Sequence, residues 1–171
     1  MRRRILLTGP PGCGKTTVVR KVANILRDGV SGFYTEEIRD AKQQRTGFRV
    51  VTLDGNRGEL ADKMSGRGPR VGSYRVNVKS FEGVALPSLE IEEGRVLIID
   101  EIGKMECCSE EFVLSVEKAF EADISILATI PLRGGGPYIE SVRCRQDVET
   151  ILVTGENREA LPERLAAMLS P

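Results

Sequence analysis

Residues 9–16 read Gly-Pro-Pro-Gly-Cys-Gly-Lys-Thr and match the pattern G-x-x-x-x-G-K-[ST] of a phosphate-binding loop, or P-loop. A short apolar run at Arg4–Thr8 comes directly before it and predicts a buried strand. Apolar residues at helical spacing follow from Lys15 to Leu26 and predict an amphipathic helix. A glycine-rich bend that opens a helix presents backbone N–H groups to an anion. This stretch therefore predicts an α/β fold organised around a polyphosphate site.

The residue types in this loop suit a triphosphate. Glycine leaves room for N–H groups to face the phosphates without a side chain between them. Lys15 is expected to bridge the outer phosphates, and the Thr16 hydroxyl is expected to ligate Mg²⁺. The predicted phosphate-binding set is Gly9, Pro10, Pro11, Gly12, Cys13, Gly14, Lys15, Thr16 and Thr17.

A second motif is Val96-Leu-Ile-Ile-Asp100, in which apolar residues end in an acid. This Walker B pattern predicts a strand beside the first, with Asp100 at the metal. Glu101 follows directly and is expected to polarise the water that attacks the γ-phosphorus. An acid in this position favours hydrolysis, because a kinase must exclude water. We therefore predict Thr16 and Asp100 as metal ligands and Lys15 and Glu101 as catalytic residues.

Later polar residues are candidates for the rest of the site. Arg143 and Arg145 follow a Gly-rich loop and are candidate arginine fingers, although an exposed helix face explains them equally well. Asn157 and Arg158 follow the last predicted strand, where Asn157 is a candidate for hydrogen bonding to the base and Arg158 for stacking on it. Helix capping by Asn157 is the alternative interpretation.

Strands and helices alternate along most of the chain. Predicted strands are 4–8, 32–38, 48–53, 74–78, 96–100, 125–130 and 150–153, and predicted helices are 15–26, 81–89, 110–120, 137–145 and 161–169. The polar segment 40–47 predicts an antiparallel hairpin, and the Gly- and Arg-rich segment 56–69 predicts a loop or a short helix. Glu36 and Glu37, near the end of the second strand, fit a metal-supporting role and a surface role equally. We predict one layered α/β domain over 1–171, with a mainly parallel central sheet and an antiparallel edge hairpin.

Composition excludes several classes of protein. Lys plus Arg and Asp plus Glu both number 25, so charge gives no support for nucleic acid or membrane partners. No apolar run approaches the roughly 20 residues of a membrane span, and the N-terminal one is too short for a signal peptide, so we expect a cytoplasmic protein. The absence of histidine excludes Ser-His and Cys-His hydrolases. No apolar surface stripe stands out as an interface, so we expect a monomer.

Several stretches together are similar to one known family. They are Gly9–Thr17, Gly32–Arg39, Asp100–Glu106, Thr129–Pro131 and Glu156–Arg158. In these stretches the chain resembles the cancer-related nucleoside triphosphatases and their thermophilic bacterial and archaeal members. The resemblance implies a three-layer RecA-like core and magnesium-dependent release of phosphate from ATP, GTP and other triphosphates, with loose base selectivity. It assigns phosphate and metal contacts to Lys15 and Thr16, the metal to Asp100 and the water to Glu101, and leaves Lys104 and Glu106 open.

Two other functions fit the same motifs. A nucleoside or nucleotide kinase has this size and this loop, but the Asp100-Glu101 pair favours water as the acceptor. A switch module would hydrolyse slowly and change shape together with an unknown partner. We expect hydrolysis as the principal activity.

Overall fold

The helices and strands largely follow the apolar periodicity of the chain. The computed structural model describes residues 2–64 and 67–170. The strands are β1 (Arg4–Thr8), β2 (Val30–Arg39), β3 (Arg45–Thr52), β4 (Arg57–Asp62), β5 (Arg70–Val71), β6 (Tyr74–Val76), β7 (Val96–Ile99), β8 (Ser125–Thr129) and β9 (Glu149–Leu152). The α-helices are α1 (Lys15–Leu26), α2 (Val78–Ser88), α3 (Glu110–Glu121), α4 (Pro137–Arg143) and α5 (Leu161–Leu169), with short 3-10 turns at η1 (Arg27–Gly29) and η2 (Glu106–Cys108).

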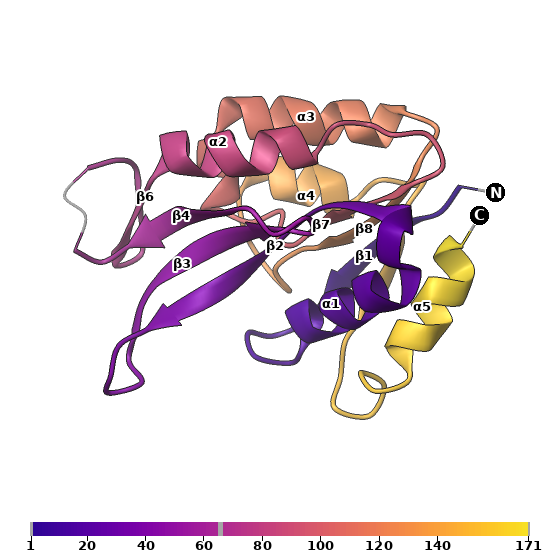
Figure 1. Cartoon of the computed structure of the whole chain (residues 1–171), viewed down its shortest axis with the longest axis horizontal. Coiled ribbons are helices and arrows are strands. Elements are labelled where there is room, and N and C mark those ends of the chain that lie inside the picture. The colour runs from indigo at the N-terminus through magenta and orange to yellow at the C-terminus, as the bar shows by residue number, and fades with distance from the viewer. Residues whose placement is uncertain (1, 65–66, 171) are drawn as a thin grey trace.

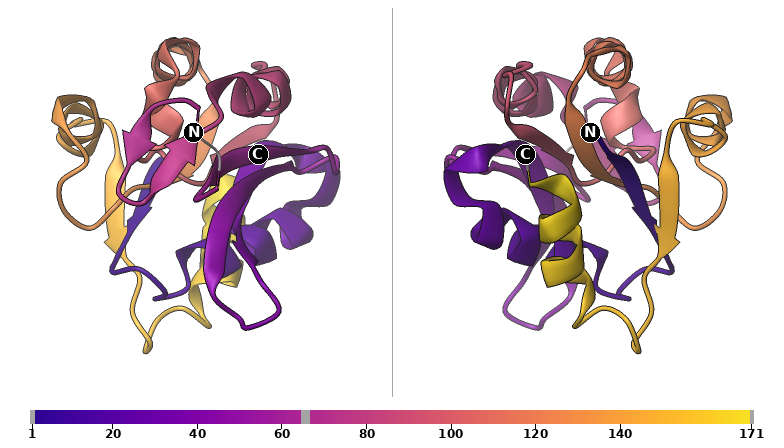
Figure 2. Two further views of the ribbon diagram at one scale, coloured as in Figure 1. Left: turned by 90° about the vertical axis from the view of Figure 1, so that its left-hand side faces the viewer. Right: turned by 90° about the vertical axis from the view of Figure 1, so that its right-hand side faces the viewer.

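Side chains of β1 alternate between two cores on opposite faces of the sheet. Ile5 and Leu7 pack in the core that contains α1 and α5. Leu6 packs in the core that contains α2, α3 and α4. Figure 1 and the end-on views of Figure 2 show the resulting three layers, with the twisted sheet between the two groups of helices. The predicted layered α/β class is confirmed.

The described strands form one sheet in the order β5-β6-β4-β3-β2-β7-β8-β1-β9. Strands β2, β7, β8, β1 and β9 pair in parallel, as predicted for the centre of the sheet. On the other side of β2, the strands β3, β4, β6 and β5 pair antiparallel. We call these four strands the antiparallel wing. The wing is larger than the edge hairpin that the sequence predicts, because three further short strands join it.

The prediction of a loop or short helix over 56–69 is wrong where β4 forms. Leu60 and Ala61 are neighbours, yet both are buried, which breaks the alternation expected of a strand. The pairing with β3 explains this, because the register shifts between Phe48 and Arg49 in a bulge or similar irregularity. Residues 65 and 66 of the segment lie outside the described residues. The predicted strand 74–78 ends early, because α2 begins at Val78 with Asn77 as its N-cap.

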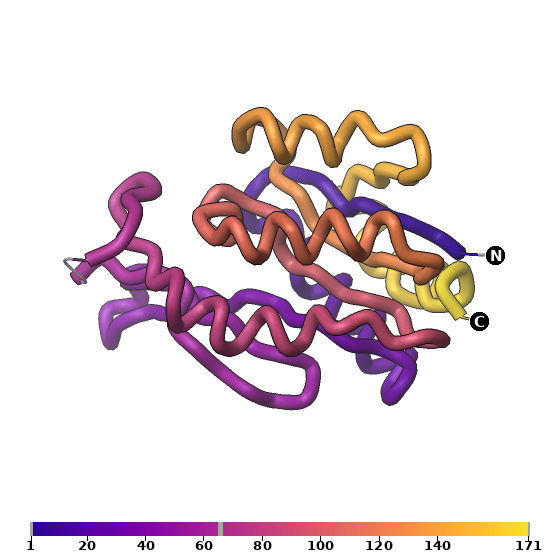
Figure 3. Tube along the Cα trace, turned by 90° about the horizontal axis from the view of Figure 1, so that it is seen from above, coloured from indigo at the N-terminus to yellow at the C-terminus, as the bar shows by residue number. Residues whose placement is uncertain are grey.

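Three aromatic rings join the wing side of the molecule to the helices. Phe33 on β2, Phe81 on α2 and Phe112 on α3 are fully buried. Their ring centroids lie 5.4–6.0 Å apart, in tilted or edge-on pairs. Figure 3 shows α2, α3 and α4 side by side over this face of the sheet. No helix within the described residues is long and apolar enough to cross a bilayer.

Candidate active site

The site forms where the parallel strands end. The P-loop follows β1, Asp100 follows β7 and Thr129 ends β8, so all three lie at one edge of the sheet. In open α/β sheets the carboxyl ends of the strands meet there and bind ligands. The topology therefore brings together Thr16, Asp100 and Thr129, although 84 positions separate the first two and 29 separate the last two.

Asp100 is the buried centre of this site, with 2% of its surface exposed. Its carboxylate accepts a hydrogen bond of 2.7 Å from the Thr16 hydroxyl and another from the Thr129 hydroxyl. Burial raises the pKa of Asp100, while these hydrogen bonds and the charge of Lys15 work to lower it. The two predicted metal ligands, Thr16 and Asp100, are thus in direct contact.

The P-loop has the backbone that phosphate binding requires. Gly14 caps α1 in a left-handed conformation, with φ of 108°, which a side chain would strain. The helix therefore begins at Lys15 and points its N-terminus into the site. The Lys15 ammonium group donates a 2.8 Å hydrogen bond to the Gly9 carbonyl and so lies back across the loop.

Glu101 and Glu106 lie on either side of Gly103. A Cβ atom on Gly103 would be 2.8 Å from a carboxylate oxygen of each, so a side chain at this position would push both carboxylates aside. The peptide bond between Asp100 and Glu101 is cis. Burial and the charge of Asp100 raise the pKa of Glu101 to about 7, against the opposing effect of Lys15. Burial, followed by the charge of Glu101, raises the pKa of Glu106 well above its usual 4.5.

A cavity of about 830 Å³ opens over these groups. Its lining includes the P-loop, the acids after β7, the loop after β8 and the near side of the antiparallel wing. Most of the predicted phosphate-binding set lines it; within that set the lining residues are Pro11, Gly12, Gly14, Lys15, Thr16 and Thr17. A chamber of this size, with convergent polar groups and perturbed carboxyls, has the features of a small-molecule active site.

Comparison with known proteins identifies this arrangement. A family model described as NTPase matches residues 4–166. The chain belongs to this NTPase family. The human cancer-related nucleoside-triphosphatase is 44% identical over 178 residues, which cover 94% of this chain and 93% of that protein. Nucleoside-triphosphatase THEP1 of Thermotoga maritima is 40% identical, with coverage of 97% and 95%.

The fold agrees with the sequence match. The crystal structure of THEP1 from the hyperthermophile Aquifex aeolicus superposes with a TM-score of 0.90 and 37% identity, covering 98% of this chain and 99% of that chain. The protein is therefore a nucleoside-triphosphatase with a P-loop NTPase fold, as the resemblance implied.

NTPases of the P-loop type generally use a divalent metal. The residues present fit such an ion, because Thr16 and Asp100 supply hard oxygen donors of the kind that Mg²⁺ prefers. Among the described residues, no group of three or more His, Cys, Asp or Glu side chains is arranged to hold a metal. A P-loop site does not need one, since phosphate oxygens and water complete the coordination of the ion.

Arg143 and Arg145, the predicted arginine fingers, are not brought to the part of the cavity that the described residues form. Arg143 pairs with Glu140 and donates to the Pro131 carbonyl. Arg145 pairs with Asp147 and lies over the ring of Phe120. Both side chains are therefore held by neighbours in their own region.

Arg133 is a cation that the sequence reasoning missed. It lies in the loop between β8 and α4 and lines the cavity, as does Lys104 after the acid pair. Within the described residues, neither side chain has a hydrogen bond or an ion pair. The sequence position could have indicated Arg133, because it comes four residues after Thr129, where the predicted parallel strand ends and ligands commonly bind.

The loop after β9 borders the P-loop. Asn157 accepts a hydrogen bond from the Thr154 N–H and donates one to the Leu152 carbonyl, so its side chain closes its own loop. The Arg158 side chain passes beside Gly14, 3.4 Å from where a Cβ atom there would lie. Arg158 thus lies next to the P-loop, and Asn157 has a structural role in the loop after β9.

Glu36 and Glu37 line the cavity from β2 with their charges already matched. Glu36 pairs with Arg49 at 2.7 Å and with Arg20 at 3.8 Å. Glu37 pairs with two further arginines, Arg39 and Arg45. These contacts favour the structural interpretation of both acids.

Proposed function

We propose that this NTPase hydrolyses nucleoside 5′-triphosphates, in a magnesium-dependent reaction, to the diphosphate and inorganic phosphate. The observation that carries the proposal is the 2.7 Å hydrogen bond between Thr16 and buried Asp100, with Glu101 next in the chain. That contact joins a P-loop hydroxyl to a Walker B carboxylate, the pair that holds the metal in P-loop NTPases.

In this proposal, P-loop N–H groups and Lys15 bind the outer phosphates, and Thr16 and Asp100 hold the metal. Magnesium, when bound, neutralises charge on the outer phosphate oxygens. Lys15 now contacts the Gly9 carbonyl, and it exchanges that weak partner for the phosphates. Arg133 is a further source of positive charge, whereas a role for Arg143 or Arg145 would require their ion pairs to open.

Glu101 acts on the attacking water. Its carboxylate accepts a proton as the water oxygen bonds to the γ-phosphorus, and the bridging bond to the β-phosphate breaks with its electron pair on the diphosphate. The carboxyl groups of Glu101 and Glu106 both lie close to Gly103, and the charge of Glu101 helps to keep Glu106 protonated. Glu101 is the group that converts binding into hydrolysis.

Broad base selectivity has support in the loop after β9. The oxygen and the nitrogen of the Asn157 amide are each already hydrogen-bonded to the backbone of that loop, so the side chain is held there and not aimed at a base. The guanidinium group of Arg158 would stack on a base, and stacking tolerates any ring. We therefore propose that ATP, GTP and other triphosphates all serve as substrates.

We also propose that residues 1–171 act as one catalytic domain, as a cytoplasmic monomer without nucleic acid partners. All four cysteines are free thiols, which suits a reducing compartment. The balanced totals of acidic and basic residues give no support for a nucleic acid partner.

A panel of triphosphates, with and without Mg²⁺, tests the function. The expected result is release of inorganic phosphate and the matching diphosphate from every triphosphate, and loss of release when the metal is removed by chelation. Formation of pyrophosphate and monophosphate, or activity that survives chelation, would overturn the proposal.

A further inference from the structure

A second cavity, of about 670 Å³, lies beside the start of β2. The pairing of β2 with β3 ends at Phe33 and Thr52, whereas its pairing with β7 continues back to Val30. Beyond Thr52 the chain turns into β4, so a notch remains along the first residues of β2. The cavity occupies this notch and reaches α1 on one face of the sheet and α2 on the other. We call it the notch cavity, and its volume is in the range of roughly 300–1,000 Å³ that small-molecule sites have.

The notch cavity and the active-site cavity occupy successive parts of β2. Residues 30–32 and 34 line the notch cavity, and residues 35–37 line the active-site cavity. Among the described residues, Arg20 on α1 alone lines both. A ligand in the notch cavity would therefore be separate from the triphosphate and would share one side chain with its site.

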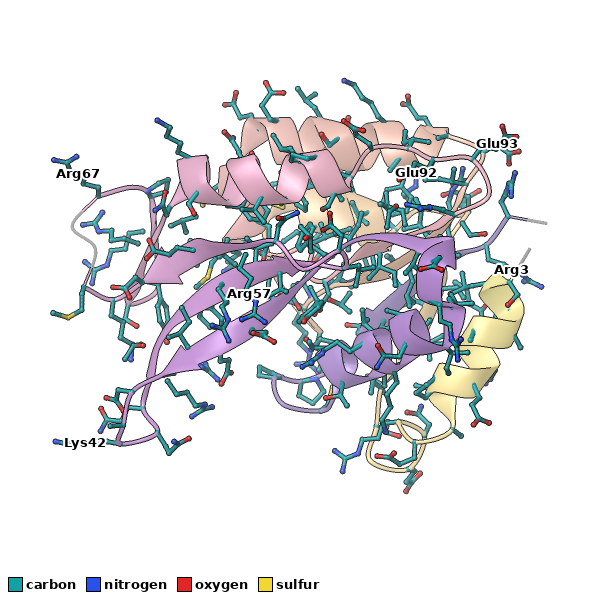
Figure 4. All side chains as sticks on the ribbon, in the orientation of Figure 1. Arg3, Lys42, Arg57, Arg67, Glu92 and Glu93 are labelled. Atoms are coloured by element: carbon teal, nitrogen blue, oxygen red, sulfur yellow. The ribbon has the colours of Figure 1, made fainter. Side chains whose placement is uncertain are left out.

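The lining of the notch cavity is rich in arginine. Its four arginines are Arg20, Arg27, Arg57 and Arg95. Arg20 and Arg95 have acidic partners. The side chains of Arg27 and Arg57 form no hydrogen bond or ion pair with any described residue. They come from different walls, because Arg27 follows α1 and Arg57, labelled in Figure 4, begins β4.

The acids of the lining leave these two arginines unpaired. They are Asp28, Asp54 and Glu92, one fewer than the arginines. Glu92 pairs with Arg95 at 2.8 Å. Asp54 accepts hydrogen bonds from the side chains of Thr52 and Asn56. Asp28 is exposed and forms no ion pair with a described residue. The excess of positive charge fits an anionic ligand, since arginine binds phosphate with two parallel hydrogen bonds.

The backbone of Arg27 supports a role for its side chain. Arg27 caps the C-terminus of α1 with φ of 51° and ψ of −119°, a conformation that glycine adopts freely and other residues rarely adopt. Such conformations cost folding free energy and are concentrated at functional sites. An arginine at this position places a long cation on the wall of the notch cavity, where glycine would fit the backbone better.

The floor of the notch cavity is apolar. Ala23, Val30 and Val51 are buried there, and Val84 from α2 is half-buried beside them. These side chains provide contact for a small organic group, while the unpaired arginines stand at the rim. A small organic molecule with one phosphate group matches both features.

We propose that the notch cavity is a second ligand site, which binds a small organic phosphate and weakens nucleotide binding at the active site. Arg27 and Arg57 bind the phosphate group, and the organic part packs on the apolar floor. This inference goes beyond the proposed function and depends on it only for the effect on the nucleotide.

Arg20 connects the two sites. Its guanidinium carbon lies 4.9 Å from the centre of the Tyr34 ring, which lines the notch cavity. Its nitrogen lies 3.8 Å from a carboxylate oxygen of Glu36, which lines the active-site cavity. An anion in the notch cavity attracts Arg20 and competes with Glu36 for it. Glu36 then keeps only Arg49 as a partner and repels the triphosphate more strongly.

Calorimetric titration with phenyl phosphate tests the site. The protein is first saturated with Mg²⁺ and a non-hydrolysable ATP analogue, so that the P-loop is filled. We expect one phenyl phosphate to bind per chain. Benzoate, which has the same ring and a single charge, should bind more weakly. No binding of phenyl phosphate would overturn the inference and leave the proposed function intact, and equal affinity for benzoate would overturn the assignment to phosphate.

Two variants locate the bound phosphate. Arg57→Glu and Arg27→Gly should each lower the affinity for phenyl phosphate about tenfold or more. Arg27→Gly should keep or raise the unfolding midpoint, because glycine relieves the backbone strain, so its loss of affinity does not come from unfolding. Lys42→Glu is the control for net charge, since Lys42 lines neither cavity. Unchanged affinity in both arginine variants, or an equal loss in Lys42→Glu, would overturn the location.

Affinity for the ATP analogue, with and without phenyl phosphate, tests the effect on the active site. Phenyl phosphate should lower this affinity about fivefold or more in the parent and in Lys42→Glu, and should leave it unchanged in Arg57→Glu. An equal fall in Arg57→Glu would show competition at the P-loop and overturn the coupling. An unchanged affinity in the parent would overturn it as well.

Discussion

The parallel half of the sheet and the antiparallel wing bury their residues in different ways. Strands β7 and β8 are buried at every position, because helices cover both of their faces. Strand β2 starts buried and becomes half-exposed toward Arg39, where it pairs only with the wing. In Figure 4, Lys42 marks the tip of the β2–β3 hairpin, which extends well away from the helices. The parallel half is thus a closed core, and the wing is a projecting wall.

The carboxyl groups near the parallel half and those near the wing also differ, in burial and in pKa. Burial raises the pKa of Asp100 and Glu106 beside the parallel strands, and among the described residues neither forms an ion pair. At the end of β2 that pairs with the wing, partial burial of Glu37 is outweighed by hydrogen bonds from Arg45 and Arg39, which lower its pKa. We infer that the parallel half supplies the reactive groups, and that the wing supplies fixed charges and a shaped surface.

The joint between the two regions should be the most sensitive part of the fold. Phe81→Ala removes the ring that packs against Phe33 and Phe112 and should destabilise the protein by about 3–5 kcal/mol. Chemical denaturation measures this loss. Leu114→Ala, at an exposed position on α3, is the control and should change stability by less than about 0.5 kcal/mol. A loss for Phe81→Ala as small as the control would mean that the two regions do not depend on this joint.

Lys15→Ala should show that catalysis belongs to the parallel half. We expect kcat/KM to fall about 10²–10³-fold, with weaker nucleotide binding, because Lys15 meets charge in both the ground state and the transition state. Steady-state phosphate release and nucleotide titration measure the two effects. Lys21→Ala changes a lysine on the same helix that pairs with exposed Glu159 and should behave like the parent. Tight binding retained by Lys15→Ala would contradict its role.

Glu106→Gln should stabilise the metal-free protein at neutral and higher pH. Burial raises the pKa of Glu106 above 4.5, so the folded chain keeps a proton that the unfolded chain releases. Stability of the parent therefore falls as pH rises above about 4.5, by up to about 1.4 kcal/mol per pH unit. Because glutamine does not titrate, the variant lacks the fall in stability that Glu106 causes. Unfolding midpoints from about pH 5 to 8 should diverge, and parallel curves for parent and variant would contradict the buried neutral carboxyl.

Arg39→Ala should have the smallest effect. The Arg39–Glu37 pair is partly exposed at the end of β2 that pairs with the wing, and Arg45 of the wing also pairs with Glu37, so we expect a loss below about 1 kcal/mol. Thermal unfolding at low and high salt checks this value, since salt should shrink the difference. A loss as large as that of Phe81→Ala would mean that the wing is held by its charges rather than by its apolar packing.

Sequence patterns were most informative in the parallel half. The bounds of β1 and α1 agree with prediction, because a continuous apolar run, a glycine-rich bend and a helical stripe follow one another without interruption. In the wing, β4 was missed because its irregular pairing with β3 places Leu60 and Ala61 side by side in the core. Local patterns cannot show such an irregularity, since it is a property of two strands together.

Some features of the candidate active site could be predicted from the sequence and others could not. The contact between Thr16 and Asp100 was predictable, because two motifs with known relative positions fix it. The burial of Glu106 was not, since it depends on how the turn at Gly103 folds back toward Glu101. Arg143 and Arg145 were chosen by their distance from a Gly-rich loop, and sequence cannot tell that Glu140 and Asp147 would hold them.

Single turnover of bound, γ-labelled ATP by Glu101→Gln tests the central claim most directly. Glu101 acts on water and not on the phosphates, so the variant should bind MgATP as the parent does. It should release phosphate about 10²–10⁴-fold more slowly. Equal rates of release from parent and variant at equal occupancy would contradict the account, because water activation would then belong to another group.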